Sequence, residues 1–114
     1  MKAKGEAAFE HVDYEKWCGM SIFEQMGNIG SEVGRAISAE RRKDETLRDA
    51  AVARAIDLFD VTADALAGAN LARLKEVLRA KEEFLGLFFD DKFDEADGVE
   101  RYFMQFAMAA RRGR

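Results

Sequence analysis

Residues 21–42 read SIFEQMGNIGSEVGRAISAERR and carry the clearest pattern in the chain, which predicts one long α-helix. Ser21 and Glu24 have the spacing of a capping box, in which each side chain bonds the backbone amide of the other residue at the helix start. Apolar residues then recur at steps of three and four, as one stripe of an α-helix requires. This predicted core-facing stripe consists of Ile22, Met26, Ile29, Val33 and Ile37.

A second stripe of the same helix consists of small residues, namely Gly27, Gly30, Ser31, Gly34 and Ser38. Each glycine inside a helix costs about 1 kcal/mol relative to alanine, so three of them need a compensating interaction. Because a missing Cβ lets another backbone come close, we expect close packing within the fold or across a dimer. A ligand against exposed backbone and local flexibility are the alternatives. The charges of Glu24, Glu32 and Arg35 exclude a membrane span for this helix.

The composition indicates a single all-helical domain. The chain has 114 residues, which is enough for one hydrophobic core. Apolar residues make up 48% and charged residues 35%, and no proline interrupts the helical patterns. The net charge of −4 means that the domain as a whole does not attract nucleic acid. One cysteine excludes an internal disulfide, and neither a membrane-length apolar run nor a signal peptide is recognisable, so we expect a cytoplasmic protein with no membrane partner.

Three further helices are predicted after the first, at residues 45–67, 71–89 and 98–111. Asp44, Asn70 and Asp97 precede them as N-caps, and Gly68 ends the second. Short connections make consecutive helices antiparallel. The predicted fold is therefore all-α: a four-helix up-down antiparallel bundle at residues 21–112, preceded by an irregular, partly disordered N-terminal arm at residues 1–20.

The predicted helix at residues 71–89, LARLKEVLRAKEEFLGLFF, is rich in large apolar residues. Its predicted inner stripe consists of Leu71, Leu74, Val77, Leu78, Phe84, Leu85, Phe88 and Phe89. Leu87 falls outside that stripe, and Met104 and Met108 fall outside the inner stripe of the last helix. We expect these three residues to form an apolar surface outside the monomer core, suited to self-association.

Lys81 falls inside the inner stripe of 71–89, where a cation has to reach solvent along its own stem or meet an acid. We hypothesise that Lys81 pairs with Glu32 of the first helix, with Asn28 and Arg35 nearby. The polar cluster Asn28, Glu32, Arg35 and Lys81 would then set the register between helices. The alternative is a lysine that extends its ammonium group to the surface without a partner.

Basic residues gather at the end of the first long helix and at the end of the chain. They are Arg41, Arg42, Lys43, Arg111 and Arg112. If the fold brings the two groups together, they form one basic patch for a phosphate or an acidic partner. Solvated helix ends are the alternative.

The sequence contains no recognisable catalytic or metal-binding constellation. His11 is its only histidine, so it lacks the repeated Glu-x-x-His of a di-iron bundle and the ligands of a zinc site. Cys18 has no patterned base beside it. The acidic segment 90–97, DDKFDEAD, lacks the ligand order of an EF-hand, which favours a solvated loop over a weak Mg²⁺ or Ca²⁺ site. We therefore predict no catalytic residue, no metal ligand and no cofactor.

Three segments, NIGSEVGRAI, LARLKEVLRAKEEFLGLFF and YFMQFAMAAR, resemble a family of small all-helical proteins of uncharacterised function from anaerobic bacteria and archaea. The resemblance covers roughly residues 17–111 and implies the fold but no chemistry. The turn AGAN at residues 67–70 departs from it, because the family pattern has a longer, proline-containing connection there. More distantly, the layout is similar to HEPN-type and S23-type bundles that act on or near RNA. The HEPN signature, an arginine followed closely by a histidine, is absent, so the resemblance implies no nuclease activity.

Three functions remain open at this stage. The favoured one is a non-enzymatic, homodimeric helical bundle that binds a protein partner. The second is an accessory RNA- or nucleotide-binding bundle without nuclease activity, which uses the basic patch. The third is an enzyme with Glu24, Glu32, Arg35 or Lys81 in a polar pocket between helices.

Overall fold

The structure is a computed structural model that describes residues 12–112, and within that range the chain forms helices and no strand. The elements are α2 (Tyr14–Cys18), α3 (Ile22–Arg41), α4 (Glu45–Leu66), α5 (Leu71–Phe89), the 3₁₀-helix η1 (Phe93–Glu95) and α6 (Ala96–Arg112). The all-α prediction is confirmed. The predicted arm at residues 1–20 contains the short helix α2, while its first eleven residues, including His11, lie outside the described residues.

The helices begin where local capping signals place them. At the start of α3, the Ser21 amide donates to Glu24 Oε1 at 3.1 Å, and the Glu24 amide donates to Ser21 Oγ at 3.1 Å. Asp44 and Asn70 accept from backbone amides in the first turns of α4 and α5. The prediction that Asp97 caps the last helix is wrong, because η1 leads directly into α6 and Asp97 lies inside its first turn.

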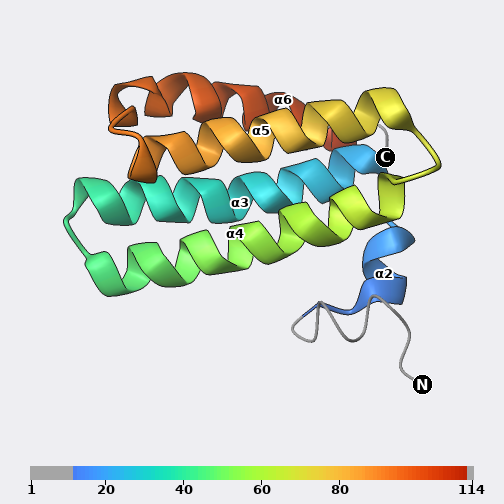
Figure 1. The fold of residues 1–114 in the computed structure, drawn as a ribbon, viewed down its shortest axis with the longest axis horizontal. Helices are drawn as coiled ribbons and strands as arrows, with labels where there is room; N and C mark the ends of the chain where they lie inside the picture. The colour runs from blue at the N-terminus through green and yellow to red at the C-terminus, as the bar shows by residue number, and fades with distance from the viewer. Residues whose placement is uncertain (1–11, 113–114) are drawn as a thin grey trace.

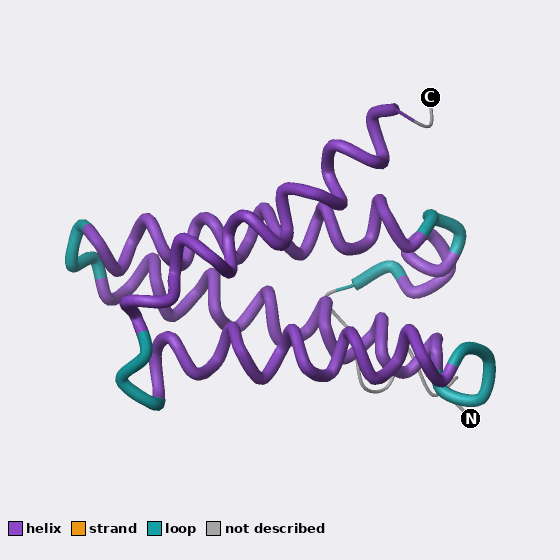
Figure 2. The backbone as a smooth tube through the Cα atoms, turned by 90° about the horizontal axis from the view of Figure 1, so that it is seen from above, coloured by secondary structure: helices purple, strands orange, loops and turns teal. Residues whose placement is uncertain are grey.

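The long helix α3 packs along α4 on one side and along α6 on the other (Figure 1). α5 packs chiefly against α4. Its contact with α6 is much less extensive than the contact between α3 and α6. The end of α6 rises away from the other helices (Figure 2). No helix in the described part of the chain is long and apolar enough to cross a membrane.

The core is built by side chains from all four long helices. Its centre is aromatic, with the Phe59 ring centroid 5.9 Å from that of Phe84 and 5.9 Å from that of Phe103. The apolar stripe predicted for α3 is buried there, apart from the half-buried Ile22 at its start. The inner side predicted for α3 is therefore confirmed. The three rings at the aromatic centre come from α4, α5 and α6 and hold these helices together.

α2 is anchored to the long helices by Trp17, which is 5% exposed. Its indole Nε1 donates to Thr62 Oγ1 at 2.8 Å, and its backbone carbonyl accepts from Gln25 Nε2 at 2.8 Å. The Trp17 amide also donates to the Asp13 carbonyl at 2.9 Å, so the indole N–H, the amide and the carbonyl of this buried residue are all satisfied, as burial requires. The contact closes one end of the molecule and joins α2 to α3 and α4.

The inner face predicted for α5 is confirmed for Val77 and Phe84, which are fully buried, but the rest of the predicted stripe is displaced around the helix. The buried residues are Val77, Ala80, Phe84, Gly86 and Leu87, whereas Leu71, Leu78 and Phe89 are exposed. Leu87, predicted to lie outside the core, is only 3% exposed. Since α5 carries apolar residues on two sides, the sequence pattern alone did not show which side packs inward.

Candidate interaction surfaces

The small-residue stripe of α3 is divided between a covered part and an open part. A Cβ added at Gly30 would lie 2.8 Å from Cβ of Phe103, and one added at Gly27 would lie 3.4 Å from Cα of Ala107. These two glycines therefore let α6 approach α3 closely, within one chain. At Gly34 the nearest atom would be Glu100 Oε2, 3.9 Å away, and Ser31 is exposed.

Three shallow hollows meet on the open part of α3. Their volumes are about 640, 510 and 220 Å³, and Ser31 lines all three. The first lies between α2, α3 and α4, and the second lies between α3 and α4. The smallest lies between α3 and α6, beside Ala107 and Arg111. Of the predicted close-packing residues, Ser31, Gly34 and Ser38 thus border open grooves in the monomer.

The predicted polar cluster is only partly assembled. Glu32, 7% exposed, accepts hydrogen bonds from Arg35 Nη1 and from Arg54 Nε, and so joins α3 to α4. Asn28 lines the same 640 Å³ hollow, and its Nδ2 lies 3.4 Å from Met20 Sδ. Arg54 was not among the predicted members of the cluster, because it lies on the exposed side of α4, where the sequence has no periodic pattern.

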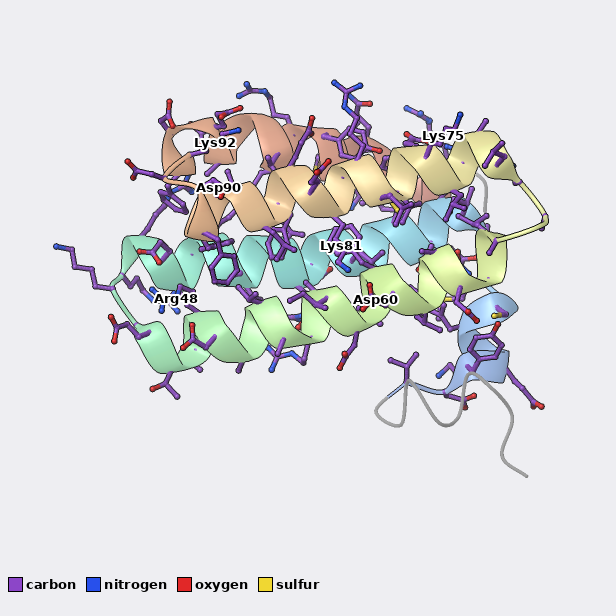
Figure 3. The ribbon with its side chains drawn as sticks, viewed as in Figure 1. Arg48, Asp60, Lys75, Lys81, Asp90 and Lys92 are labelled. Carbon is purple, nitrogen blue, oxygen red and sulfur yellow. The ribbon has the colours of Figure 1, made fainter. Side chains whose placement is uncertain are left out.

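Lys81 does not belong to that cluster. Its Nζ lies 2.6 Å from Oδ1 of Asp60 on α4, and the two side chains point toward each other between α5 and α4 (Figure 3). The predicted pair of Lys81 with Glu32 is wrong because α4, not α3, is the main neighbour of α5. The alternative of an unpartnered lysine is also wrong. The Lys81–Asp60 pair joins α5 to α4. A pair between two helices is what the predicted role in setting their register requires.

The predicted basic patch is not assembled either. Arg41 forms ion pairs with Asp97 and Glu100, at 2.6 and 3.2 Å, and Arg42 donates to Ser38 Oγ. Arg111 lies at the other end of α3, beside Glu24. Glu24 and Arg41 are separated by roughly 26 Å at ~1.5 Å per residue. Because α6 runs antiparallel to α3, the basic residues Arg41, Arg42 and Lys43 are held apart from Arg111 and Arg112.

The side of α5 that faces away from the core carries a row of residues spaced by four and three. This outer row of α5 consists of Leu71, Lys75, Leu78, Glu82, Leu85 and Phe89. Leu71, Leu78 and Phe89 are 65%, 46% and 70% exposed, and Leu85 is half-buried. Lys75, near the start of α5, is exposed (Figure 3). Glu82 is exposed as well. In the monomer, Leu71, Leu78 and Phe89 are therefore exposed near the start, the middle and the end of α5.

Exposed apolar residues occur on α6 and α3 as well. Met104 and Met108, one turn apart, are 56% and 45% exposed, and Phe23 of α3 is also exposed. The Phe23 ring centroid lies 6.4 Å from that of Phe106, so part of this side chain rests on α6. These residues are further apolar side chains exposed outside the outer row of α5.

Another hollow, of about 760 Å³, lies where α5, η1 and α6 meet, and it is acidic. Its carboxylates are those of Glu82, Glu83, Asp90, Asp94, Glu95 and Asp97, against the cations Lys92 and Arg101. Within residues 12–112, no three acidic, histidine or cysteine side chains are grouped closely enough to hold a metal ion.

Among the titratable groups of residues 12–112, Tyr102 is the one whose pKa its environment shifts most strongly. Burial, and then the hydrogen bond from its hydroxyl to Glu76 Oε2 at 2.8 Å, raise the pKa of Tyr102 far above its ordinary value. A tyrosine held protonated in this way is not a base, and it joins α6 to α5. Its environment gives it a structural role.

Comparisons of the chain with protein-family models, with curated proteins and with solved structures found no match.

Proposed function

We propose that this protein is a non-enzymatic helical module that forms homodimers through the outer row of α5. The observation that carries the proposal is that α5 has two apolar sides and that, among residues 12–112, only one of them is buried. A helix that is apolar on both sides requires two layers of cover. In this proposal the four long helices form an up-down bundle, and a second bundle supplies the missing layer.

A second copy is the proposed occupant because the outer row carries both signs of charge. Lys75 lies between Leu71 and Leu78, and Glu82 lies between Leu78 and Leu85. Such a surface can be complementary to itself, as a twofold symmetric interface requires. One helix row is small compared with the interfaces of permanent dimers, so we expect a dissociation constant of roughly micromolar magnitude.

Sedimentation equilibrium of the wild type and of Leu78→Glu tests the proposal. The wild type should dimerise, and the variant should dissociate at least about tenfold more readily, because it places a carboxylate in the middle of the apolar row. Leu47→Glu is the matched control, since Leu47 is 53% exposed but lies on α4, outside the row. A wild type that stays monomeric up to about 500 μM, a concentration well above this micromolar range, would refute the proposal.

A second candidate function, accessory RNA or nucleotide binding, is favoured by the arginines around the open part of α3. Arg35, Arg42 and Arg54 line the 510 Å³ hollow, and the two that bond Glu32 keep more than half of their side-chain surface exposed. Guanidinium groups with free donors suit phosphate. A gel shift with single-stranded RNA tests this candidate, and absence of binding at low salt would remove it.

A further inference from the structure

We infer that the second copy docks on α5 in the antiparallel direction, with the twofold axis beside Leu78. This inference rests on the proposed self-association and adds its geometry. It is drawn from the spacing of the outer row and from the charges within it. The pairing puts Leu71 on Leu85 of the second copy, and Lys75 beside its Glu82.

The spacing of the row suits a twofold axis at Leu78. Leu71 and Leu85 both lie seven residues from Leu78, so an antiparallel copy brings each onto the other at the same height. Lys75 lies three residues before Leu78 and Glu82 four residues after it. Their heights along the paired helices then differ by one residue, or about 1.5 Å, which a lysine side chain spans easily. One arrangement therefore matches the apolar and the charged residues together.

The opposite direction brings like charges together. In a parallel pair with Leu78 on Leu78, Lys75 would meet Lys75 and Glu82 would meet Glu82. Like charges opposed at an interface disfavour that arrangement, whereas the antiparallel copy forms two Lys75–Glu82 pairs. A parallel pair shifted by one heptad would match one set of charges but would not close as a dimer.

The ion pairs already present on α5 single out the same two residues. Arg73 pairs with Glu76 at 2.7 Å, Arg79 with Glu83 at 3.4 Å, and Lys81 with Asp60 at 2.6 Å. Among the described residues, Lys75 and Glu82 are the charged side chains of α5 that form no ion pair. The charges left available on α5 are thus the ones that face the proposed copy.

Disulfide trapping between single-cysteine variants tests the direction. Cys18 is exposed, so it is first replaced in the background variant Cys18→Ser. Leu71→Cys and Leu85→Cys are then oxidised separately and as a mixture. In the antiparallel dimer, two copies of residue 71 are roughly 21 Å apart along the helices, far beyond disulfide reach. We expect a cross-linked dimer in the mixture, and none from Leu71→Cys alone.

Charge reversal provides a second test that does not depend on forming a disulfide. Lys75→Glu and Glu82→Lys should each weaken the dimer about tenfold, and the double reversal should restore it, because it exchanges the partners of both pairs. In a parallel dimer, Lys75→Glu leaves like charges opposed and changes the dissociation constant little.

The outcomes separate the two proposals. A monomeric wild type removes the proposed function and the inference with it. A dimer in which Leu71→Cys cross-links to itself, or in which Lys75→Glu dimerises like the wild type, leaves the proposed function standing and overturns the antiparallel arrangement. A dimer whose mixed variants do not cross-link also overturns it.

Discussion

α3 and α5 each have a second face outside the core, and the two faces differ in size of side chain and in how far they are covered. On α3 this face is made of small residues, and α6 covers Gly27 and Gly30 at close range. On α5 it is made of large apolar residues, and nothing in the described chain covers Leu71, Leu78 or Phe89. The glycines of α3 are thus partly explained within the monomer. The leucines of α5 are not, and they are the stronger indication of a partner.

The largest effect should separate the two faces of α5. Phe84→Ala removes a fully buried ring at the aromatic centre, and we expect the free energy of unfolding to fall by about 3–5 kcal/mol. Leu78→Ala, on the outer row, should change it by less than about 1 kcal/mol in the dilute monomer. Chemical denaturation at low protein concentration measures both. Comparable losses from the two substitutions would show that the outer row is buried in the monomer.

A smaller effect should divide the stripe on α3. Gly30→Ala forces Phe103 to move, because the new Cβ would lie 2.8 Å from Cβ of Phe103, and we expect the free energy of unfolding to fall by about 1–3 kcal/mol. Gly34→Ala meets nothing closer than 3.9 Å and should stabilise the helix by up to about 1 kcal/mol. Thermal unfolding of both variants should give shifts of opposite sign. Two stabilising shifts would mean that α6 does not press on α3.

The smallest effect concerns the looser contact between α6 and α5. Because the pKa of Tyr102 is raised in the folded protein, the folded state holds this proton after the unfolded chain has lost it. The stabilisation is therefore complete below pH about 10, the ordinary tyrosine pKa, and is lost as the pH rises above it. Tyr102→Phe should show a weaker decline in stability between pH 9 and 11 than the wild type does. Parallel declines would assign the alkaline loss to other groups.

Much of the fold was predictable from local signals, because caps act within one turn. Ser21, Asp44 and Asn70 each bond the backbone where the sequence places a helix start. The prediction of Asp97 as an N-cap was wrong because η1 forms a turn directly before α6, and the sequence of the acidic segment does not show this turn.

The candidate surfaces were less predictable, since they depend on which helices become neighbours. The wheel of α5 offers one side with Val77, Ala80, Phe84 and Leu87 and another with Leu71, Leu78 and Phe89. Both sides carry large apolar residues, so the pattern of apolar residues does not show which side packs inward. Lys81 was predicted to pair with Glu32 and pairs with Asp60 for the same reason, because the sequence does not show which helix lies beside α5.

The docking of α2 gives this protein a natural optical reporter. Trp17 is the only tryptophan in the chain, and its indole is sealed between helices with its N–H bonded to Thr62. Indole emission shifts to longer wavelength when water reaches the ring. Fluorescence of the unmodified protein would therefore follow the release of α2, and comparison with circular dichroism would show whether that release precedes the melting of the long helices.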